Sequence, residues 1–379
     1  MSTPLILEIE SLICRDPARR GLISSEAKFG PLCCGHLAHA ASDLETRARR
    51  IVIVTGFFIP RGDPPSAETD GPPGAVLLAA ALTAIGIDVW IVTDTLCESA
   101  VRATAAAFGW SADRVQAFER LDPATAAAFL REHHRAGLSH LIATERVGPS
   151  HTRDTVTSLP SPLGGAGSGV RSRPHVSALE SRLQPVPPEG GNPTPPPHTL
   201  PQGESVLLAA FDRLCPPEHR NHCHNMRGEI IDEFSADLHL LFDDAQRSLP
   251  DVTTIGIGDG GNEIGMGTIA WAELARRLSG EQAGWIPCRI PATWNIVAGT
   301  SNWGAQALAA SVLLLRGRTD VLAPWDEQHE ARVLEHVVEH GPAVDGVTRR
   351  REPTVDGIPF LTYIQPWVGM RRLLGLDAT

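Results

Sequence analysis

The chain is 379 residues long, enough for one large domain or two ordinary ones and for a core that needs no disulfide bonds. Hydrophobic residues make up 42% of it and charged residues 20%, a composition typical of globular proteins. The formal net charge of −11 argues against a nucleic-acid-binding protein, because such proteins carry a basic surface. We therefore expect no nucleic-acid partner.

The lysine, cysteine and apolar patterns exclude further classes. Lys28 is the only lysine and lies in a polar stretch without a glycine-rich frame, so we do not expect a Schiff-base or pyridoxal mechanism. The seven cysteines show no framework or zinc-knuckle spacing, which favours reduced thiols and a cytoplasmic location. Glu8 and Glu10 interrupt the first apolar run, and Gly86 and Asp88 interrupt the longest one. We therefore expect neither a signal peptide nor a membrane segment.

In chain order, the first half of the sequence predicts a strand at 51–54, a loop at 56–71 and a helix at 72–85. Two more strands are predicted at 87–92 and 138–144. The first strand is a β-branched run, as expected of a buried parallel strand. Pro72 and Pro73 fit the first turn of the helix, where a missing N–H costs little, and Gly86 is a natural end.

The second half repeats the pattern of strand, loop and helix, with strands at 253–257 and 294–298 and helices at 268–278 and 303–315. A glycine-rich loop lies between the first of these strands and its helix. Alternating strands and helices predict an α/β fold with a largely parallel or mixed sheet flanked by helices.

Residues 149–203 interrupt this alternation. Their serine-, glycine- and proline-rich stretches contain few large apolar side chains, too few to offset the entropy lost on ordering. We expect a flexible Pro/Gly-rich insertion between the first part of one domain, 1–148, and its second part, 204–379. A domain boundary at the same place is the alternative. An insertion should be dispensable, because loop length affects closure entropy only logarithmically.

Glu68 and Asp70 lie directly before the helix that begins at Pro72, where the helix dipole and free N–H groups favour carboxylates. A helix cap alone would account for one of these side chains or for Thr69. It would leave the second carboxylate and the stiff Gly-Pro-Pro-Gly sequence unexplained. We therefore interpret this segment as part of a functional site.

A glycine-rich segment, 256–267, carries Asp259, Asn262 and Glu263 directly after a predicted strand. Its glycines formally match the dinucleotide-binding fingerprint, but Asp259 would then face a pyrophosphate, and no acidic residue ends a clear second strand about twenty positions later. Carboxylate and amide oxygens on a tightly folded backbone suit a hard cation such as Mg²⁺ or Mn²⁺. A glycine-rich turn with solvated acids is the alternative.

Three further segments place polar side chains where a site is expected: Glu145-Arg146 at a strand end, Asn225-Met226-Arg227 after the insertion, and Asn302 at a helix start. For the last of these, a plain helix cap explains the sequence equally well.

Other polar clusters need no function. The Asp345-Gly346 and Asp356-Gly357 pairs are explained as hairpin turns. His222 and His224 flank Cys223 without a second pair of ligands, so we expect no zinc site there.

Several motifs together resemble the signature of the D-glutamate cyclase family, specifically its C-terminal catalytic-type domain. The resemblance runs from about Leu5 to Pro366, apart from the proline-rich insertion. The motifs are Val54–Phe57, Glu68–Ala75, Glu145-Arg146, Asn225–Gly228, Gly258–Gly267, Ala298–Gly304 and Val355–Pro359.

The resemblance implies a lyase that removes water from D-glutamate and closes it to 5-oxo-D-proline. It implies that catalysis falls to five acidic residues, Glu68, Asp70, Glu145, Asp259 and Glu263. All of these except Glu145 are candidate ligands of a divalent metal, Mn²⁺ or Mg²⁺, that would polarise the γ-carboxylate. Glu145 is then the candidate base for the amine proton.

The remaining polar residues are candidate substrate-binding groups in this scheme. Arg146 or Arg227 would bind the α-carboxylate through paired hydrogen bonds. Asn225, Asn262 and Asn302 would orient the substrate.

Two other functions remain open at this point. One is a metal-dependent phosphatase or other hydrolase that uses the same carboxylates. The other is a nucleotide-binding module built on the glycine-rich loop. The expected partner is a small amino-acid substrate, and a homo-oligomer remains open.

Overall fold

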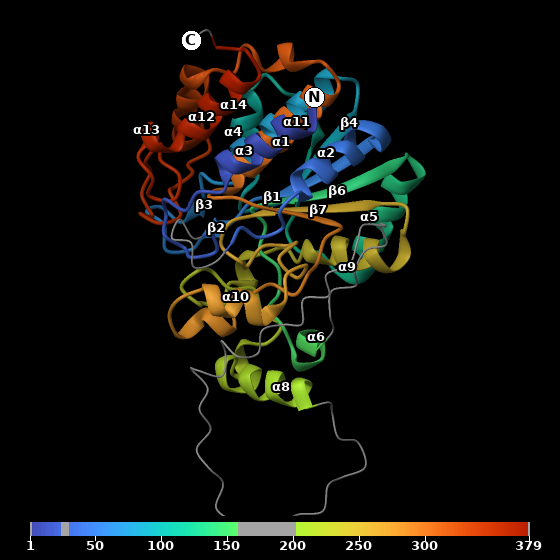
Figure 1. Ribbon diagram of the computed structural model, residues 1–379, viewed down its shortest axis with the longest axis vertical. Coiled ribbons are helices and arrows are strands. Elements are labelled where there is room, and N and C mark those ends of the chain that lie inside the picture. Colours follow the sequence, from blue (N-terminus) through green and yellow to red (C-terminus); the bar gives the residue numbers. More distant parts are fainter. Residues whose placement is uncertain (1, 24–29, 158–201, 378–379) are drawn as a thin grey trace, which may run out of the picture.

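The computed structural model describes residues 2–23, 30–157 and 202–377 (Figure 1). Its centre is a six-stranded sheet with the strand order β5-β4-β1-β6-β7-β8, in which every neighbouring pair is parallel. The strands are β1 (Arg50–Thr55), β4 (Asp88–Asp94), β5 (Val115–Phe118), β6 (Leu138–Thr144), β7 (Thr253–Gly258) and β8 (Trp294–Val297). A short hairpin pairs β2 (Phe58–Ile59) with β3 (Ser66–Ala67). The expected α/β fold is confirmed.

The helices cover both faces of this sheet (Figure 1). One face forms a large hydrophobic cluster with helices α1 (Ser2–Ile13), α2 (His36–Arg47), α3 (Pro72–Ala84), α11 (Ser301–Leu315) and α14 (Gln365–Leu373). The other face packs against α5 (Pro123–Arg135), α9 (His239–Ser248) and α10 (Trp271–Arg277). Further helices are α4 (Glu98–Ala107), α6 (Arg153–Thr157), α8 (Gln202–Leu214), α12 (Glu327–His340) and α13 (Phe360–Tyr363).

Strand β1 shows how the sequence builds two layers. Ile51 and Ile53 face the α1-α3-α11 side, whereas Val52 and Val54 face the α5-α9 side. Successive side chains of a strand point to opposite faces, so a strand covered on both sides must be apolar throughout. This explains why a continuous β-branched run marks a central strand.

The strand order reverses direction between β1 and β6, because β4 and β5 lie on one side of β1 whereas β6, β7 and β8 follow on the other. Ligands of open α/β sheets bind outside the carboxyl ends of the strands at such a point. The order is also that of dinucleotide-binding folds, but there the glycine-rich loop follows the first strand. Here it follows β7, which argues against the dinucleotide interpretation.

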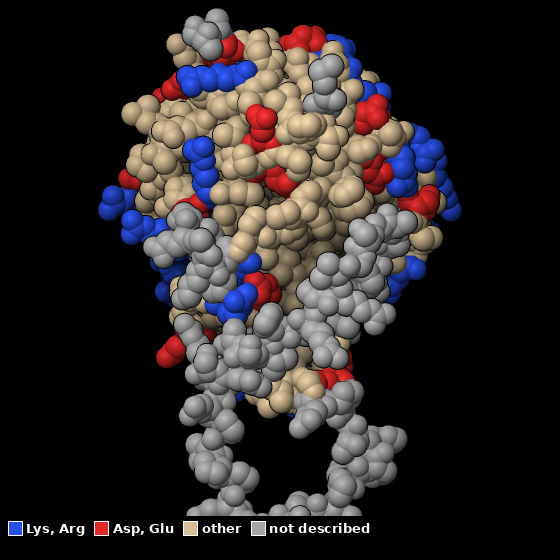
Figure 2. Space-filling view, in the orientation of Figure 1, with Lys and Arg blue, Asp and Glu red and all other residues tan. Residues whose placement is uncertain are grey.

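Acidic and basic side chains are interspersed on the face shown in Figure 2, mostly toward its edge. None of the helices in the described ranges combines the length and the apolar character of a membrane span.

The structure moves the start of the expected insertion. Ser150 and His151 are buried, and backbone bridges join Pro149 to Cys223 and Ser150 to Cys288. Helix α6 then packs on α8 through Val156. The amino-acid composition did not predict that these residues are packed, because the residues they contact lie far away along the chain. At its other end, residues 202 and 203 of the expected insertion belong to helix α8. Residues 158–201, which lie between, are outside the described residues.

This boundary leads to a test of dispensability. Replacing residues 158–201 by a short Gly-Ser linker should leave the melting temperature nearly unchanged, because closure entropy varies slowly with loop length. Deleting 152–203 should lower it, because that deletion also removes the packing of Val156. Thermal unfolding of the two deletions side by side checks this. Equal melting temperatures would show that α6 adds no stability.

Candidate active site

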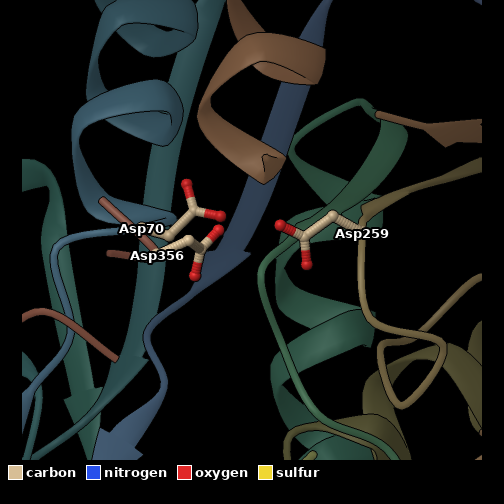
Figure 3. Close-up of side chains that lie close together, drawn as sticks. All are labelled: Asp70, Asp259 and Asp356. Carbon is tan, nitrogen blue, oxygen red and sulfur yellow. The ribbon is translucent and has the colours of Figure 1, made fainter. Parts of the chain in front are cut away.

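Acidic side chains from distant parts of the sequence converge at the carboxyl edge of the sheet. Asp70 precedes α3, Asp259 follows β7, and Asp356 lies on a turn before α13. One oxygen from each lies within 4.8 Å of the others, and all three residues are buried. Figure 3 shows Asp70 and Asp356 side by side, with Asp259 directed toward them from the opposite side. A second such group combines Glu145, Asp259 and Glu263.

Asp70 and Asn302 cap each other's helices. The Asp70 carboxylate accepts hydrogen bonds from the backbone N–H groups of Ser301 (2.8 Å) and Asn302 (2.9 Å), at the start of α11. The Asn302 Oδ1 accepts from the N–H groups of Gly71 (3.0 Å) and Gly74 (2.8 Å), at the start of α3. Asp70 therefore caps α11 rather than its own helix, and two positive helix ends point into the site.

This arrangement requires a very close approach of the two helices. A Cβ atom on Gly74 would lie 2.7 Å from the Cα of Asn302. Only glycine fits there, which explains the glycine in the Gly-Pro-Pro-Gly sequence.

Glu263 holds the loop after β7 in shape. Its carboxylate accepts from the backbone N–H groups of Asp259 (2.9 Å), Gly260 (2.6 Å) and Gly261 (2.7 Å). A Cβ on Gly258 would lie 2.8 Å from the Glu263 Cδ atom. The glycines therefore let the backbone wrap around one carboxylate, and Glu263 positions Asp259.

Glu68 and Glu145 line the pocket beside these aspartates. Both are 5% exposed. Glu145 Oε2 accepts a hydrogen bond of 2.6 Å from the Ser301 hydroxyl. Glu145 and Asp356 also have positive φ angles, of 46° and 56°, which non-glycine residues rarely adopt and which cluster at functional sites.

The guanidinium group of Arg20 bridges the carboxylates of Asp259 and Asp356. Arg20 lies on the segment that follows α1, far from both partners in the sequence. It is the cation that the structure places among the acidic side chains, and its side chain is 15% exposed.

The turn that carries Asp356 is fixed by Asp345. The carboxylate of Asp345 accepts from the N–H groups of Val347 and Thr348 (both 2.8 Å) and from Gly357 N–H and the Thr354 hydroxyl (both 2.7 Å). The two Asp-Gly pairs interpreted as independent hairpin turns are therefore one structure, and it contributes Asp356 to the site.

Burial and mutual repulsion raise the pKa values of these carboxyl groups. Burial and the neighbouring Asp356 raise the pKa of Asp70 to about 7. Burial followed by Glu145 raises the pKa of Glu68 well above its usual value, and burial followed by Glu263 does the same for Glu145. Burial also raises the pKa of Asp259 and Asp356, although Arg20 opposes it. Each of these shifts favours the protonated form of its carboxyl group, and perturbed carboxyl groups of this kind cluster at functional sites.

These shifts predict that stability falls as pH rises. A carboxyl whose pKa is higher in the folded state stabilises the fold at low pH and loses that contribution as pH rises through the folded pKa. For Asp70 the loss runs from about pH 4, where an exposed carboxyl titrates, to about pH 7, and Glu68, Glu145 and Asp259, whose pKa values are raised well above the usual values, add to the decline. Buried His224 and His239, whose pKa values burial lowers to about 4, act in the opposite direction, but only below about pH 6.5. In EDTA the melting temperature should therefore decline from about pH 6.5 to pH 8.

A control variant distinguishes the contribution of the site's carboxyl groups to this pH dependence from that of another buried carboxyl group. Burial raises the pKa of Glu330 to about 7 against hydrogen bonds from Tyr363 and Gln306, and Glu330 belongs to neither group of converging carboxylates. Glu330→Gln should reduce the decline only in part. A melting temperature that rises between pH 6.5 and pH 8 in EDTA would contradict the shifts.

A pocket of about 200 Å³ opens over the cluster. Its buried end is lined by Glu68, Glu145, Asn262 and Arg20, and its outer part by apolar and arginine side chains. Pockets for drug-sized ligands have about 300–1,000 Å³, so this one suits a smaller molecule.

The structure divides the expected substrate-binding residues into two groups. Asn225, Arg227 and Asn262 line the pocket. Asn302 is fully buried as a helix cap, and its Nδ2 donates to Thr69 O. Arg146 is 1% exposed, lies outside the pocket lining, and donates to Asp94, Gly56 O and Ser235. These contacts let Arg146 hold the loop after β1 rather than touch a ligand.

Sequence reasoning missed Arg20 and Asp356 as site residues. Asp356 lies in Val355–Pro359, one of the motifs that resemble the family, and that resemblance could have identified it as a site residue. It was interpreted as part of a hairpin turn instead. Arg20 lies in no such motif, and only its long-range contacts reveal it.

Comparisons with known proteins agree with this picture. A family model described as D-glutamate cyclase-like, C-terminal matches residues 9–158 and 186–365. The human protein named D-glutamate cyclase, mitochondrial is 28% identical over 310 residues, which cover 82% of this chain and 39% of that protein. The chain thus spans about two fifths of the length of that relative. The family match covers most of the chain, and we conclude that the chain belongs to the D-glutamate cyclase-like, C-terminal family.

Proposed function

We propose that the protein is a lyase of the D-glutamate cyclase type, which dehydrates D-glutamate to 5-oxo-D-proline with the help of a divalent cation. The observation that carries the proposal is the buried acidic cluster beneath a small pocket. Burial raises the pKa values of Glu68, Asp70, Glu145, Asp259 and Asp356, neighbouring carboxylates raise each of them further, and Arg20 is the nearby counter-charge. Such a floor favours a cationic group.

The donor set fits a hard divalent cation. Four buried carboxylate or amide oxygens of the acidic cluster and the pocket lack a hydrogen-bond partner among the described residues: Glu68 Oε1, Asp259 Oδ2, Asp356 Oδ2 and Asn262 Oδ1. Carboxylate and amide oxygens are the ligands that Mg²⁺ and Mn²⁺ prefer. Asp70, Asp259 and Asp356 would hold the ion, which would supply Lewis-acid polarisation of the substrate γ-carboxylate.

The protein's own residues would perform the proton transfers. Ring closure forms a bond between the amine nitrogen and the carbon of the γ-carboxyl group, and one oxygen of that group leaves as water. The ammonium group loses two protons, one before and one after the bond forms, and the leaving oxygen gains two. Glu68 and Glu145 line the pocket, and their raised pKa values suit one to hold the proton for the leaving oxygen and the other to accept the amine proton. Asn262 would orient the substrate.

An assay of the purified protein tests this function. D-glutamate and L-glutamate are incubated separately with and without Mn²⁺, and 5-oxoproline is measured by chromatography. We expect product from D-glutamate, more with Mn²⁺ than with EDTA. Conversion should fall by about 10²–10⁴-fold in Glu145→Gln, the range that a positioned acid or base contributes. Absence of product from both enantiomers under every condition would refute the proposal.

A metal-dependent phosphatase is the second candidate, because arginines at the pocket mouth also suit a phosphoryl group. Release of phosphate from a generic aryl phosphate in the same preparation would favour it. We also propose a cytoplasmic location, which the seven free cysteines support.

A further inference from the structure

The outer part of the pocket carries three arginines that the acidic floor does not use. Arg61, Arg227 and Arg349 all line the pocket. The Arg61 side chain is 67% exposed and Arg227 is exposed, whereas Glu68 and Glu145 at the floor are buried. The pocket therefore has a basic rim, defined as these three arginines, above an acidic floor.

The basic rim holds more positive charge than its described neighbours neutralise. Arg61 forms a 2.8 Å ion pair with Glu229, which also lines the pocket. Arg227 donates to the backbone oxygen of Val347 at 3.2 Å. Burial and then the nearby Arg349 and Arg61 lower the pKa of Arg227, so each of these two guanidinium groups lies close enough to Arg227 to repel it. Holding like charges close together costs electrostatic free energy unless a ligand of opposite charge neutralises them.

Arg349 is held in an unfavourable backbone conformation at this rim. Its φ angle is +63°. Its backbone N–H donates to Asp345 O (2.8 Å), and its carbonyl accepts from Asp63 N–H (2.9 Å), so both sides of the turn fix it. Its Nε atom is buried and makes no hydrogen bond to any residue that the structure describes. Strain of this kind persists where the surroundings enforce it, and it clusters at ligand sites.

We propose that the basic rim is an oxyanion subsite, which binds an anionic group of a ligand whose amino group faces the acidic floor. This deepens the proposed function and rests on it, because it assigns one carboxylate of D-glutamate to the rim and leaves its amine and its other carboxylate to the floor. Guanidinium groups bind carboxylate and phosphate through paired hydrogen bonds, so either group has the required chemistry. The α-carboxylate of an amino acid and a phosphate group are the two sources to distinguish.

Direct titration of two probes tests the subsite without relying on turnover. D-glutamate and inorganic phosphate are titrated calorimetrically into the wild type and into Arg61→Gln and Arg349→Gln. Arg350→Gln is the matched control, because Arg350 is the exposed neighbour of Arg349 and lies outside the pocket lining. Each rim substitution should weaken binding about tenfold, the effect of losing a charge-assisted hydrogen bond. Arg349→Lys should restore part of the affinity.

The outcomes separate the two sources and the two proposals. A loss confined to D-glutamate identifies a carboxylate subsite, and a loss confined to phosphate identifies a phosphate subsite; both support the inference. Wild-type affinity in both rim variants, an equal loss in Arg350→Gln, or no binding of either probe would overturn it. Rim-dependent binding without any 5-oxoproline would refute the proposed function and leave the subsite intact.

Discussion

Asp259→Asn and Asp356→Asn should each weaken Mn²⁺ binding by at least about 10- to 100-fold, the range found when only the outer-shell partners of a metal site are changed. Each substitution removes one charge and nearly preserves side-chain volume. Position 356 has a positive φ angle, which asparagine tolerates better than most residues, so the fold should survive. Calorimetric titration of Mn²⁺ provides the measurement, together with the 5-oxoproline assay.

Three further variants distinguish loss of a metal ligand from other effects of the substitutions. Asp320→Asn removes an aspartate that is paired with Arg318 at the surface, and it should leave Mn²⁺ affinity unchanged. Arg20→Gln should instead raise the affinity, because the Arg20 guanidinium bridges Asp259 and Asp356 and competes with a cation for them. The double variant Asp259→Asn/Asp356→Asn should lose little beyond either single variant, since two ligands of one ion act as a unit. Unchanged affinity in both single variants would rule out the cation site.

Asn302→Ala should destabilise the protein strongly and should not act mainly through substrate binding. It leaves the buried N–H groups of Gly71 and Gly74 and the carbonyl of Thr69 without their partner. A buried unsatisfied group costs about 1–3 kcal/mol, so a total loss of several kcal/mol is expected. Thermal unfolding measures the loss.

Thr300→Ala is the matched control for Asn302→Ala. Thr300 is the ordinary cap of α11, and its hydroxyl accepts one hydrogen bond, from Trp303 N–H at 3.2 Å. Its loss should cost about 1 kcal/mol. A stable Asn302→Ala protein with a raised KM for D-glutamate would instead support the substrate-orienting role that the sequence suggests.

The central strands and the places where functional side chains gather could be predicted from the sequence alone. The predicted strand at 138–144 coincides with β6, because a strand covered on both faces must be apolar along its whole length. The expectation that carboxylates gather at strand ends placed Asp70, Glu145 and Asp259 in one site. The edge strand β5 was missed, since only Val115 of its four residues is buried.

Which polar groups face the ligand and which stabilise the fold could not be predicted from the sequence, because this depends on tertiary contacts. Arg146, a candidate for the substrate, is paired with Asp94, whereas Arg20, which no motif marked, contacts Asp259 and Asp356. Local patterns show that a residue is charged and near an element end, but the direction of its side chain depends on partners that are distant along the chain. Asn302 illustrates the reason: its amide oxygen caps a helix far back in the chain, and its partner Gly71 is separated from it by 231 positions in the sequence.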